Sequence, residues 1–173
     1  MTVLRAVQSN ITALDVNAIV NAANTSLLGG SGVDGAIHRA GGPELVNECR
    51  DLHGCKVGQA KITKGYRLPA RFIIHTVGPV WNGGEKNEAI LLASCYRESL
   101  LLAEQHKLKT IAFPCISTGI YRFPLELAAE IAIKTTLDFC SNQTGIETVT
   151  YCCFSEHDWA VYKNLLNEKE YAP

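Results

Sequence analysis

The chain has 173 residues, which suits one domain spanning residues 1–173 with a core that needs neither disulfides nor a structural metal. Lys plus Arg total 16 against 17 for Asp plus Glu, so no basic field exists to gather nucleic acid, although backbone N–H groups can still bind a small anion. No apolar run approaches a membrane span, and the seven cysteines have no framework spacing. We therefore expect a cytoplasmic protein with reduced thiols and no membrane association.

Short apolar runs rich in Val, Ile, Phe and Thr alternate with segments of helical periodicity along the chain. In chain order we expect strands at 3–7 and 18–21, helices at 35–40 and 43–52, strands at 60–63 and 72–77, a helix at 88–106, a strand at 110–113, a helix at 124–141, a strand at 148–154 and a helix at 156–168. Pro43 and Pro124 are expected at first helical positions, and Ser155 at an N-cap. The alternation predicts an α/β layered domain whose sheet is covered on both faces.

The segment from Val20 to His38 leaves an apolar strand, passes through a glycine-rich loop and enters a helix. Its glycines allow close approach of a ligand to the backbone, and a helix N-terminus offers unpaired N–H groups to an anion. The spacing is neither that of a P-loop nor that of a dinucleotide fingerprint. Taken alone, this segment is as compatible with a connecting loop as with a ligand site.

A second loop of this kind runs from Phe113 to Pro124. It also leaves a strand, carries Ser117, Thr118 and Gly119, and enters a helix. In α/β domains, ligands bind beyond the carboxyl ends of the strands. Two such loops therefore predict a diphosphate held between them.

Four segments together resemble the macrodomain family, in its MacroD-like hydrolytic branch. They are Asn-Ala-Ala-Asn, Gly-Gly-x-Gly-Val-Asp-Gly-Ala-Ile-His, His-Thr-Val-Gly-Pro-x-Trp and Ile-Ser-Thr-Gly-Ile-Tyr, in family order over essentially the whole chain. The resemblance implies a three-layer α/β/α macrodomain with a central mixed, mostly parallel sheet. Its implied ligand is ADP-ribose, bound across the strand ends.

The resemblance also implies a role for each matching position. Asn24 and Asp34 face the distal ribose, Asp34 orients or deprotonates the attacking water, and Gly32 and Val33 give backbone contacts. The other implied contacts are the amides of Ser117, Thr118, Gly119 and Ile120 to the diphosphate, Tyr121 over the distal ribose, and Asn10, Ile11 and Phe154 near the adenine.

The sequence departs from the family pattern at the adenine end. Where the family usually has Gly-Asp-Ile-Thr, this chain has Ser9-Asn10-Ile11-Thr12. Asn10 can still accept a hydrogen bond, but as a neutral group, so some loss of affinity or base selectivity is expected. Ser31 and Arg122 also replace usual glycines, which affects the loop geometry.

Each candidate residue also has a structural interpretation. Asp34 could merely complement a helix dipole, although the resemblance favours the catalytic role. Asn21 and Asn24 could be turn residues that bond their own backbone; we expect this for Asn21 and a ligand contact for Asn24. His38 and His75 could be general bases, but satisfied core or supporting histidines are expected.

Cysteine chemistry is a further alternative. Cys49, His53 and Cys55 could suggest zinc, but their spacing does not match the pattern of zinc-dependent macrodomains. Cys115 lies in the second loop and could be a nucleophile, yet no base is evident beside it, so a small buried filler is expected.

The sequence thus predicts a hydrolase without cofactor or metal, which cleaves O-acetyl-ADP-ribose or mono-ADP-ribose esters on acidic side chains of proteins. A positioned water, an aspartate and amide donors suffice for this chemistry. A silent ADP-ribose reader is the first alternative, kept open by Asn10. An RNA-associated regulator is the second, and the neutral charge gives it no support.

Overall fold

The computed structural model describes residues 1–168. The strands are β1 (Val3–Gln8), β2 (Ala18–Ala22), β3 (Ala60–Lys64), β4 (Phe72–Thr76), β5 (Thr110–Phe113) and β6 (Thr148–Cys153). The helices are α1 (Gly32–Gly41), α2 (Pro43–Asp51), α3 (Glu88–Gln105), α4 (Leu125–Cys140) and α5 (Glu156–Glu168), with a 3-10 turn η1 (Ile11–Ala13) after β1. Every expected element is present, and η1 is the addition.

Two helix starts differ from the sequence-based expectation. Helix α1 begins at Gly32 rather than Gly35, because Ser31 is the last extended residue, and this brings Asp34 into the first turn. Pro124 is the N-cap of α4 rather than its first helical residue, since its ψ of 126° is extended. Pro43 does open α2, and the hydroxyl of Ser155 accepts from Asp158 N at 3.1 Å as expected of an N-cap.

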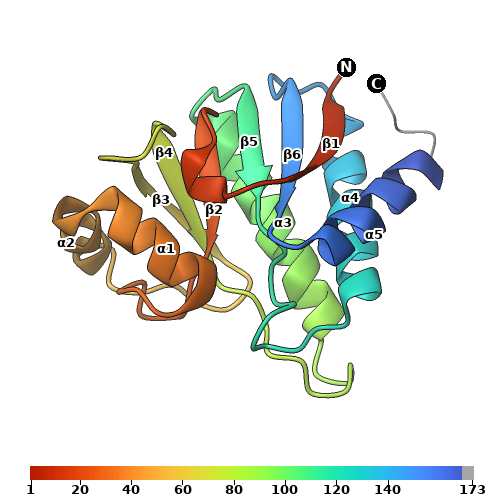
Figure 1. Cartoon of the computed structure of the whole chain (residues 1–173), viewed down its shortest axis with the longest axis horizontal. Coiled ribbons are helices and arrows are strands. Elements are labelled where there is room, and N and C mark those ends of the chain that lie inside the picture. Colours follow the sequence, from red (N-terminus) through yellow and green to blue (C-terminus); the bar gives the residue numbers. More distant parts are fainter. Residues whose placement is uncertain (169–173) are drawn as a thin grey trace.

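The strands form one mixed sheet in the order β1-β6-β5-β2-β4-β3. All neighbouring strands are parallel except β3 and β4, which are antiparallel. The antiparallel strand β3 lies at one edge of the sheet. Figure 1 shows the sheet with α1 and α2 beside β2, β3 and β4 and with α4 and α5 at the opposite end. The predicted mixed, mostly parallel sheet is confirmed.

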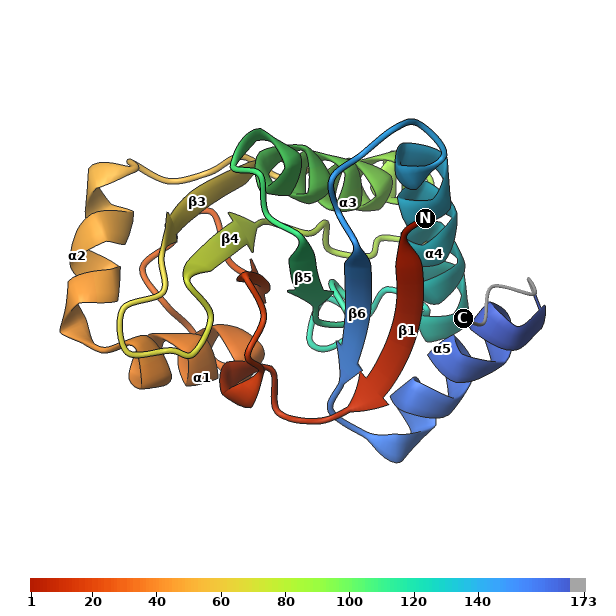
Figure 2. The same ribbon diagram turned by 90° about the horizontal axis from the view of Figure 1, so that it is seen from above.

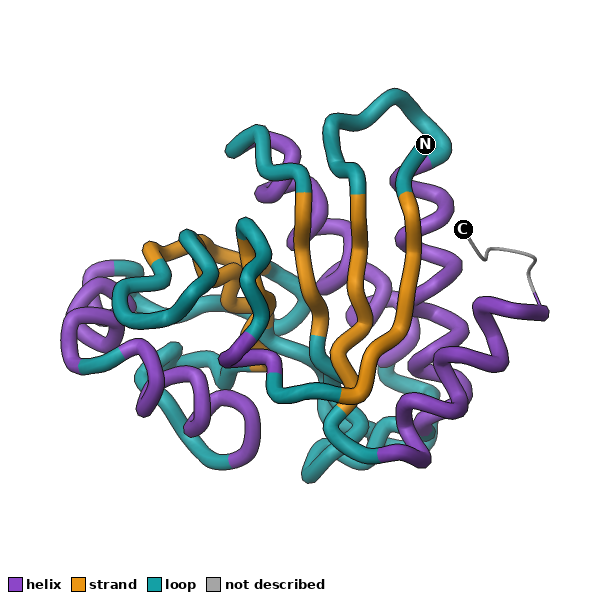
Figure 3. Tube along the Cα trace, turned by 45° about the horizontal axis from the view of Figure 1, so that its top comes forward, coloured by secondary structure: helices purple, strands orange, loops and turns teal. Residues whose placement is uncertain are grey.

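Helices cover both faces of the sheet. Figure 2 shows α3 and α4 along one side and α1 along the other. The buried side chains accordingly form two cores: Ile37, Leu45 and Cys49 pack with Ile19 and Ile73 on the α1 and α2 face, and a larger core joins α3, α4 and α5 to the opposite face. The tube view in Figure 3 shows the strands between these helices. The three-layer arrangement follows from the apolar character of the strands on both faces.

A crevice forms where neighbouring strands lead to opposite faces. β2 pairs with β5 at Ala18 with Ile111 and at Ile19 with Ala112, after which the chain continues from β2 into α1 on one face and from β5 into α4 on the other. Ligands of α/β proteins bind at such switch points. The loops that follow β2, β4 and β5 meet at the lower edge of the sheet in Figure 1. Within residues 1–168, no helix has both the length and the apolar character of a membrane span.

Candidate active site

A groove of about 780 Å³ lies at this crevice. Its volume falls in the range of small-molecule sites. It is lined by all the residues that the sequence analysis assigned to ligand contact: Asn10, Ile11, Asn24, Gly32, Val33, Asp34, Ser117, Thr118, Gly119, Ile120, Tyr121 and Phe154. The fold therefore brings together segments from β1, β2, α1, β5 and β6 that are far apart in sequence.

The loop after β5 presents free backbone amides to the groove. It is closed by hydrogen bonds from Phe123 N to Ser117 O at 2.9 Å and from Arg122 N to Gly119 O at 3.0 Å. The N–H groups of residues 117–121 donate to no acceptor within residues 1–168, and the buried Ser117 hydroxyl also has no partner there. Consecutive free N–H groups in a turn form an anion-binding concavity.

This loop is supported from beneath by the segment after β4. Trp81 N donates to Tyr121 O at 2.8 Å, and the Trp81 ring packs on Phe123 with a centroid distance of 4.8 Å. Gly78 allows the approach, since a Cβ there would lie 2.1 Å from the Ser117 hydroxyl. Ser117 and Arg122 both have positive φ, 66° and 61°, so the Arg at a usual glycine position keeps the left-handed backbone conformation of that position.

The N-terminus of α1 forms the opposite wall of the groove. Its N-cap, Ser31, makes no side-chain capping bond, so the first-turn amides remain open. Gly35 must lack a side chain, because a Cβ there would lie 2.4 Å from Gly30 O. The glycine-rich loop is thus pressed against α1, and an anion between the two loops would meet open amides from both sides.

Asp34 is buried at the end of this wall, with 5% of its surface exposed. Asn21 Nδ2 donates to its Oδ1 at 2.9 Å, and His38 Nε2 lies 3.4 Å from the same oxygen. The other oxygen, Oδ2, faces the position of an ideal Gly30 Cβ at 3.0 Å, and Asn24 Nδ2 lies 3.4 Å from that same position. Both of these polar atoms therefore lie close to the Gly30 backbone, where Asn24, Gly30 and Asp34 line the groove together.

The two asparagines of Asn-Ala-Ala-Asn have different hydrogen-bond partners, and the expectation for Asn21 is not met. Asn24, expected as a ligand contact, closes the turn: its Oδ1 accepts from Ser26 N at 3.1 Å and Leu27 N at 3.2 Å, and its Nδ2 donates to Gly29 O at 2.8 Å. It still lines the groove. Asn21, expected as a turn residue, is instead fully buried in β2 and bonds Asp34. The turn interpretation of Asn21 was wrong because it considered only local backbone partners.

The far end of the groove has a different character. Phe154 is 88% exposed and offers a flat apolar face beside buried Ile11. Asn10 Oδ1 accepts from Thr12 N at 3.0 Å and from Thr12 Oγ1 at 2.7 Å, which leaves its Nδ2 as the group available to a ligand. Asp158, in the first turn of α5, lines the same end. Sequence reasoning missed Asp158, although its position three residues after an N-cap Ser was a signal.

The two central histidines have supporting positions. His75 is fully buried and bonds Asn21 and Thr63, and burial together with nearby His38 lowers its pKa from 6.5 to about 3. His75 is therefore a satisfied core histidine, as expected. His38 lies beside Asp34 on the next turn of α1.

The cysteine nucleophile and the zinc site, the two alternatives based on cysteine, gain no support from the structure. A hydrogen bond with Cys153, with burial as the second cause, raises the pKa of the Cys115 thiol far above its usual value, which opposes a nucleophilic role. Among the described residues, no three His, Cys, Asp or Glu side chains are placed to hold a metal ion. Cys49 instead contacts His75 Nε2 at 3.8 Å.

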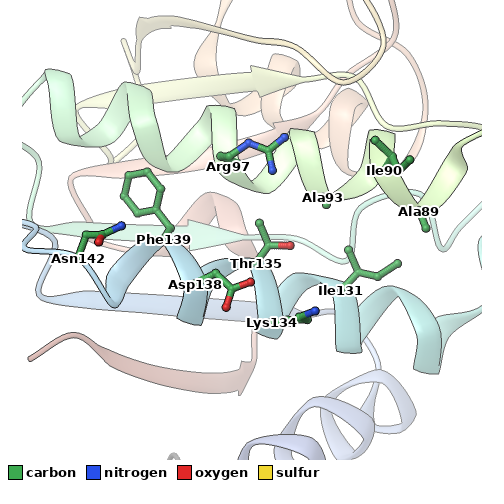
Figure 4. Close-up of a pocket in the computed structure, with 10 residues that line it drawn as sticks. All are labelled: Ala89, Ile90, Ala93, Arg97, Ile131, Lys134, Thr135, Asp138, Phe139 and Asn142. Carbon is green, nitrogen blue, oxygen red and sulfur yellow. The ribbon is translucent and has the colours of Figure 1, made fainter.

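A second hollow, of about 510 Å³, lies between α3 and α4, away from the strand ends (Figure 4). It is lined by Ile90, Ile131 and Phe139 and flanked by Arg97, Lys134 and Asp138. It has no counterpart to the loop after β5, whose consecutive N–H groups donate to no acceptor within residues 1–168. The groove at the strand ends, which has open amides on two sides, is therefore the better candidate for a phosphorylated ligand.

A comparison with known protein families shows which family this chain belongs to. The family model described as Macro domain matches residues 20–132, which include the glycine-rich loop, the segment after β4 and the loop after β5. The chain belongs to the Macro domain family. It is 63% identical over 163 residues to a Macro domain-containing protein of Chlorobaculum tepidum, covering 94% of this chain and 95% of that protein.

Other relatives carry more informative names. This macrodomain is 57% identical over 163 residues to ADP-ribose glycohydrolase MACROD2 of Xenopus laevis, covering 93% of this chain and 39% of that longer protein. A mutant macrodomain of Oceanobacillus iheyensis, solved with ADPR, aligns with a TM-score of 0.91 and 44% identity over 96% of this chain and 93% of that one. The Trypanosoma brucei macrodomain in complex with ADP-ribose gives a TM-score of 0.89 and 42% identity, covering 94% of this chain and 68% of that one. The expected macrodomain fold is confirmed.

Proposed function

We propose that this macrodomain binds ADP-ribose in the groove and hydrolyses ester-linked ADP-ribose. The diphosphate lies between the amides of residues 117–121 and the N-terminus of α1, which supply donors without a net positive charge. The base lies against Phe154 and Ile11, and the distal ribose lies between Tyr121 and Asp34. The solved neighbours with bound ADP-ribose and ADPR support this choice of ligand.

The observation that carries the catalytic part is that Asp34 Oδ2 and Asn24 Nδ2 lie together at the stretch of the groove that Gly30 lines. A water there can donate to the carboxylate and be oriented by the amide. Asp34 takes a proton as the water oxygen attacks the ester carbonyl carbon. The bond to the ribose oxygen then breaks, and the proton passes to that oxygen, giving a free carboxylic acid and ADP-ribose.

The substrates that fit this chemistry are O-acetyl-ADP-ribose and mono-ADP-ribose esters on acidic side chains of proteins. The names of the MACROD2 relatives, ADP-ribose glycohydrolases, support hydrolysis. No step requires a cofactor. Asp34 is the proton acceptor, and the Asn24 Nδ2 hydrogen that is not bonded to Gly29 O orients the water.

A single-turnover assay tests the proposal against the reader alternative. A peptide carrying ADP-ribosyl-glutamate and one carrying arginine-linked ADP-ribose are each mixed with excess protein. Release from the ester and not from the arginine linkage supports ester hydrolysis. Tight binding of ADP-ribose in calorimetry without release from either peptide would establish a reader instead.

A further inference from the structure

Behind Asp34, four buried side chains from neighbouring elements form one hydrogen-bonded row. Asn21 Nδ2 contacts both Asp34 Oδ1, at 2.9 Å, and His75 Nδ1, at 3.1 Å. His75 Nε2 in turn contacts Thr63 Oγ1 at 2.9 Å. Asn21 and His75 are direct register partners on β2 and β4, and Thr63 is on the adjacent β3.

The contacts at the two ends of this row, with Asp34 Oδ1 and with Lys64 O, favour one direction for its hydrogens. Thr63 Oγ1 donates to Lys64 O at 3.2 Å, and a carbonyl oxygen can only accept, so the hydroxyl is left to accept from His75 Nε2–H. Since His75 is neutral, with its pKa lowered to about 3 chiefly by burial, its Nδ1 carries no hydrogen and accepts from Asn21. Asn21 therefore turns its NH₂ group toward Asp34.

The row is shielded from water, so no solvent molecule can replace a missing partner. Asn21 and His75 are fully buried, Thr63 is 2% exposed and Asp34 is 5% exposed. The remaining ionisable neighbours are His38, whose ring centroid is 6.3 Å from that of His75, and Cys49, whose pKa is raised to about 11, mainly by burial, so that it remains a thiol. Cys49 Sγ lies 3.8 Å from His75 Nε2 and is a weak acceptor, whereas Thr63 Oγ1 lies at 2.9 Å.

We propose that His75 and Thr63 are positioning residues for ester cleavage, which fix the amide of Asn21 and through it the orientation of the Asp34 carboxylate. This inference rests on the proposed function. If Thr63 loses its hydroxyl, His75 is free to carry its hydrogen on Nδ1. That hydrogen opposes the Asn21 NH₂, which pushes the Asn21 amide away from its position between His75 Nδ1 and Asp34 Oδ1. The hydrogen bond that fixes the orientation of the Asp34 carboxylate is then lost.

The matched test compares Thr63→Val, which keeps the shape and removes the hydroxyl, with Thr63→Ser, which keeps the hydroxyl. We expect Thr63→Val to lower kcat for the ADP-ribosyl-glutamate ester about 10-fold or more, with KM and the Kd for ADP-ribose nearly unchanged. Thr63→Ser should retain wild-type kcat within roughly threefold. A purely structural role predicts instead that both variants track their melting temperatures, with no split between kcat and KM.

A measurement that does not depend on activity completes the test. Nitrogen NMR of ¹⁵N-histidine-labelled protein reports which ring nitrogen of His75 carries the hydrogen. We expect Nε2–H in the wild type and in Thr63→Ser, and a shift toward Nδ1–H in Thr63→Val. An Nδ1–H tautomer in the wild type, or an unchanged tautomer and kcat in Thr63→Val, would overturn the inference. If the wild type cleaves no ester, the proposed function fails and the positioning role fails with it, whereas a failure of the row alone leaves wild-type turnover intact.

Discussion

Gly30 and Asp34 face each other across the space assigned to the attacking water. A Cβ at Gly30 would lie 3.0 Å from Asp34 Oδ2, a tighter contact than a carboxylate oxygen normally makes with carbon, and 3.4 Å from Asn24 Nδ2. The backbone of Gly30 does not have positive φ, so a side chain at this position meets a steric restriction and not a conformational one. A side chain at Gly30 would therefore crowd the Asp34 carboxylate and the Asn24 amide.

The first prediction is that the methyl group of Gly30→Ala displaces the Asp34 carboxylate and the Asn24 amide, which a Cβ would meet at 3.0 Å and 3.4 Å. We expect turnover of the ester substrate to fall about 10² -fold, because displacement of a positioned reactant by around 1 Å can cost that much. The melting temperature should change little. Gly145→Ala is the matched control, since Gly145 also lacks positive φ and a Cβ there meets no atom within 4 Å. If Gly30→Ala and Gly145→Ala turned over the ester at the same rate, the assignment of the attacking water to this part of the groove would be wrong.

The second prediction separates catalysis from binding at Asp34. Asp34→Asn keeps the size of the side chain and an oxygen to accept from Asn21, but it cannot take a proton. General-base assistance contributes about 10² to 10⁴ in rate, so kcat should fall at least about 10²-fold, while the Kd for ADP-ribose stays nearly unchanged. Single-turnover release and calorimetry measure the two quantities. A loss confined to affinity would make Asp34 a ribose ligand and leave the base unassigned.

The third prediction concerns base recognition at Asn10. Because Asn10 Oδ1 already accepts from Thr12, a ligand meets its Nδ2 donor. Asn10→Asp keeps the bonds to Thr12 and presents a charged acceptor instead, which should tighten ADP-ribose by about 1 kcal/mol through the adenine amino group.

The matched ligand for this variant is the hypoxanthine analogue of ADP-ribose, which has a carbonyl where adenine has its amino group. Calorimetry should show that Asn10→Asp discriminates against this analogue and that the wild type does so much less. Unchanged preference in Asn10→Asp would place the base away from residue 10.

The fourth prediction is a pH dependence of stability that arises from His75. Its pKa in the folded state is lowered to about 3, below its unfolded value of 6.5, so the unfolded chain takes up the proton first as the pH falls. The free energy of unfolding should therefore decrease from pH 6.5 downward, by about 1.4 kcal/mol per pH unit.

The window from pH 6.5 to 5 isolates this effect. The Glu88 carboxylate is buried, which raises its pKa, but hydrogen bonds from the backbone of Asn82, Gly84 and Lys86 outweigh this and lower the pKa to about 2, so its contribution to stability is lost only below its usual value of 4.5. Urea unfolding of the wild type and His75→Gln should give a shallower pH slope for the variant. Parallel slopes would mean that His75 is protonated in the folded protein.

Local patterns in the sequence determined the elements and the two loops. Strands such as Thr110–Phe113 and the helix Glu156–Glu168 could be predicted to the residue, because apolar periodicity and the Ser155 N-cap are local features. The same holds for the glycine-rich loop and the loop after β5, where the residue types themselves supply backbone freedom and open amides. All the assigned contact residues, among them Asp34 and Phe154, line one groove because the strand order brings these segments together.

Only the tertiary structure decided what each polar side chain bonds. Asn21 and Asn24 have the same side chain and lie three residues apart. Asn24 bonds its own loop, whereas Asn21 bonds Asp34 and His75. His75 is 54 residues from Asn21 in the chain, and parallel pairing of β2 with β4 makes them neighbours. Most buried polar groups in proteins are hydrogen-bonded, and the fold decides which partner is within reach. Strand order and register fix that partner, and neither is encoded in the spacing of residues along one segment.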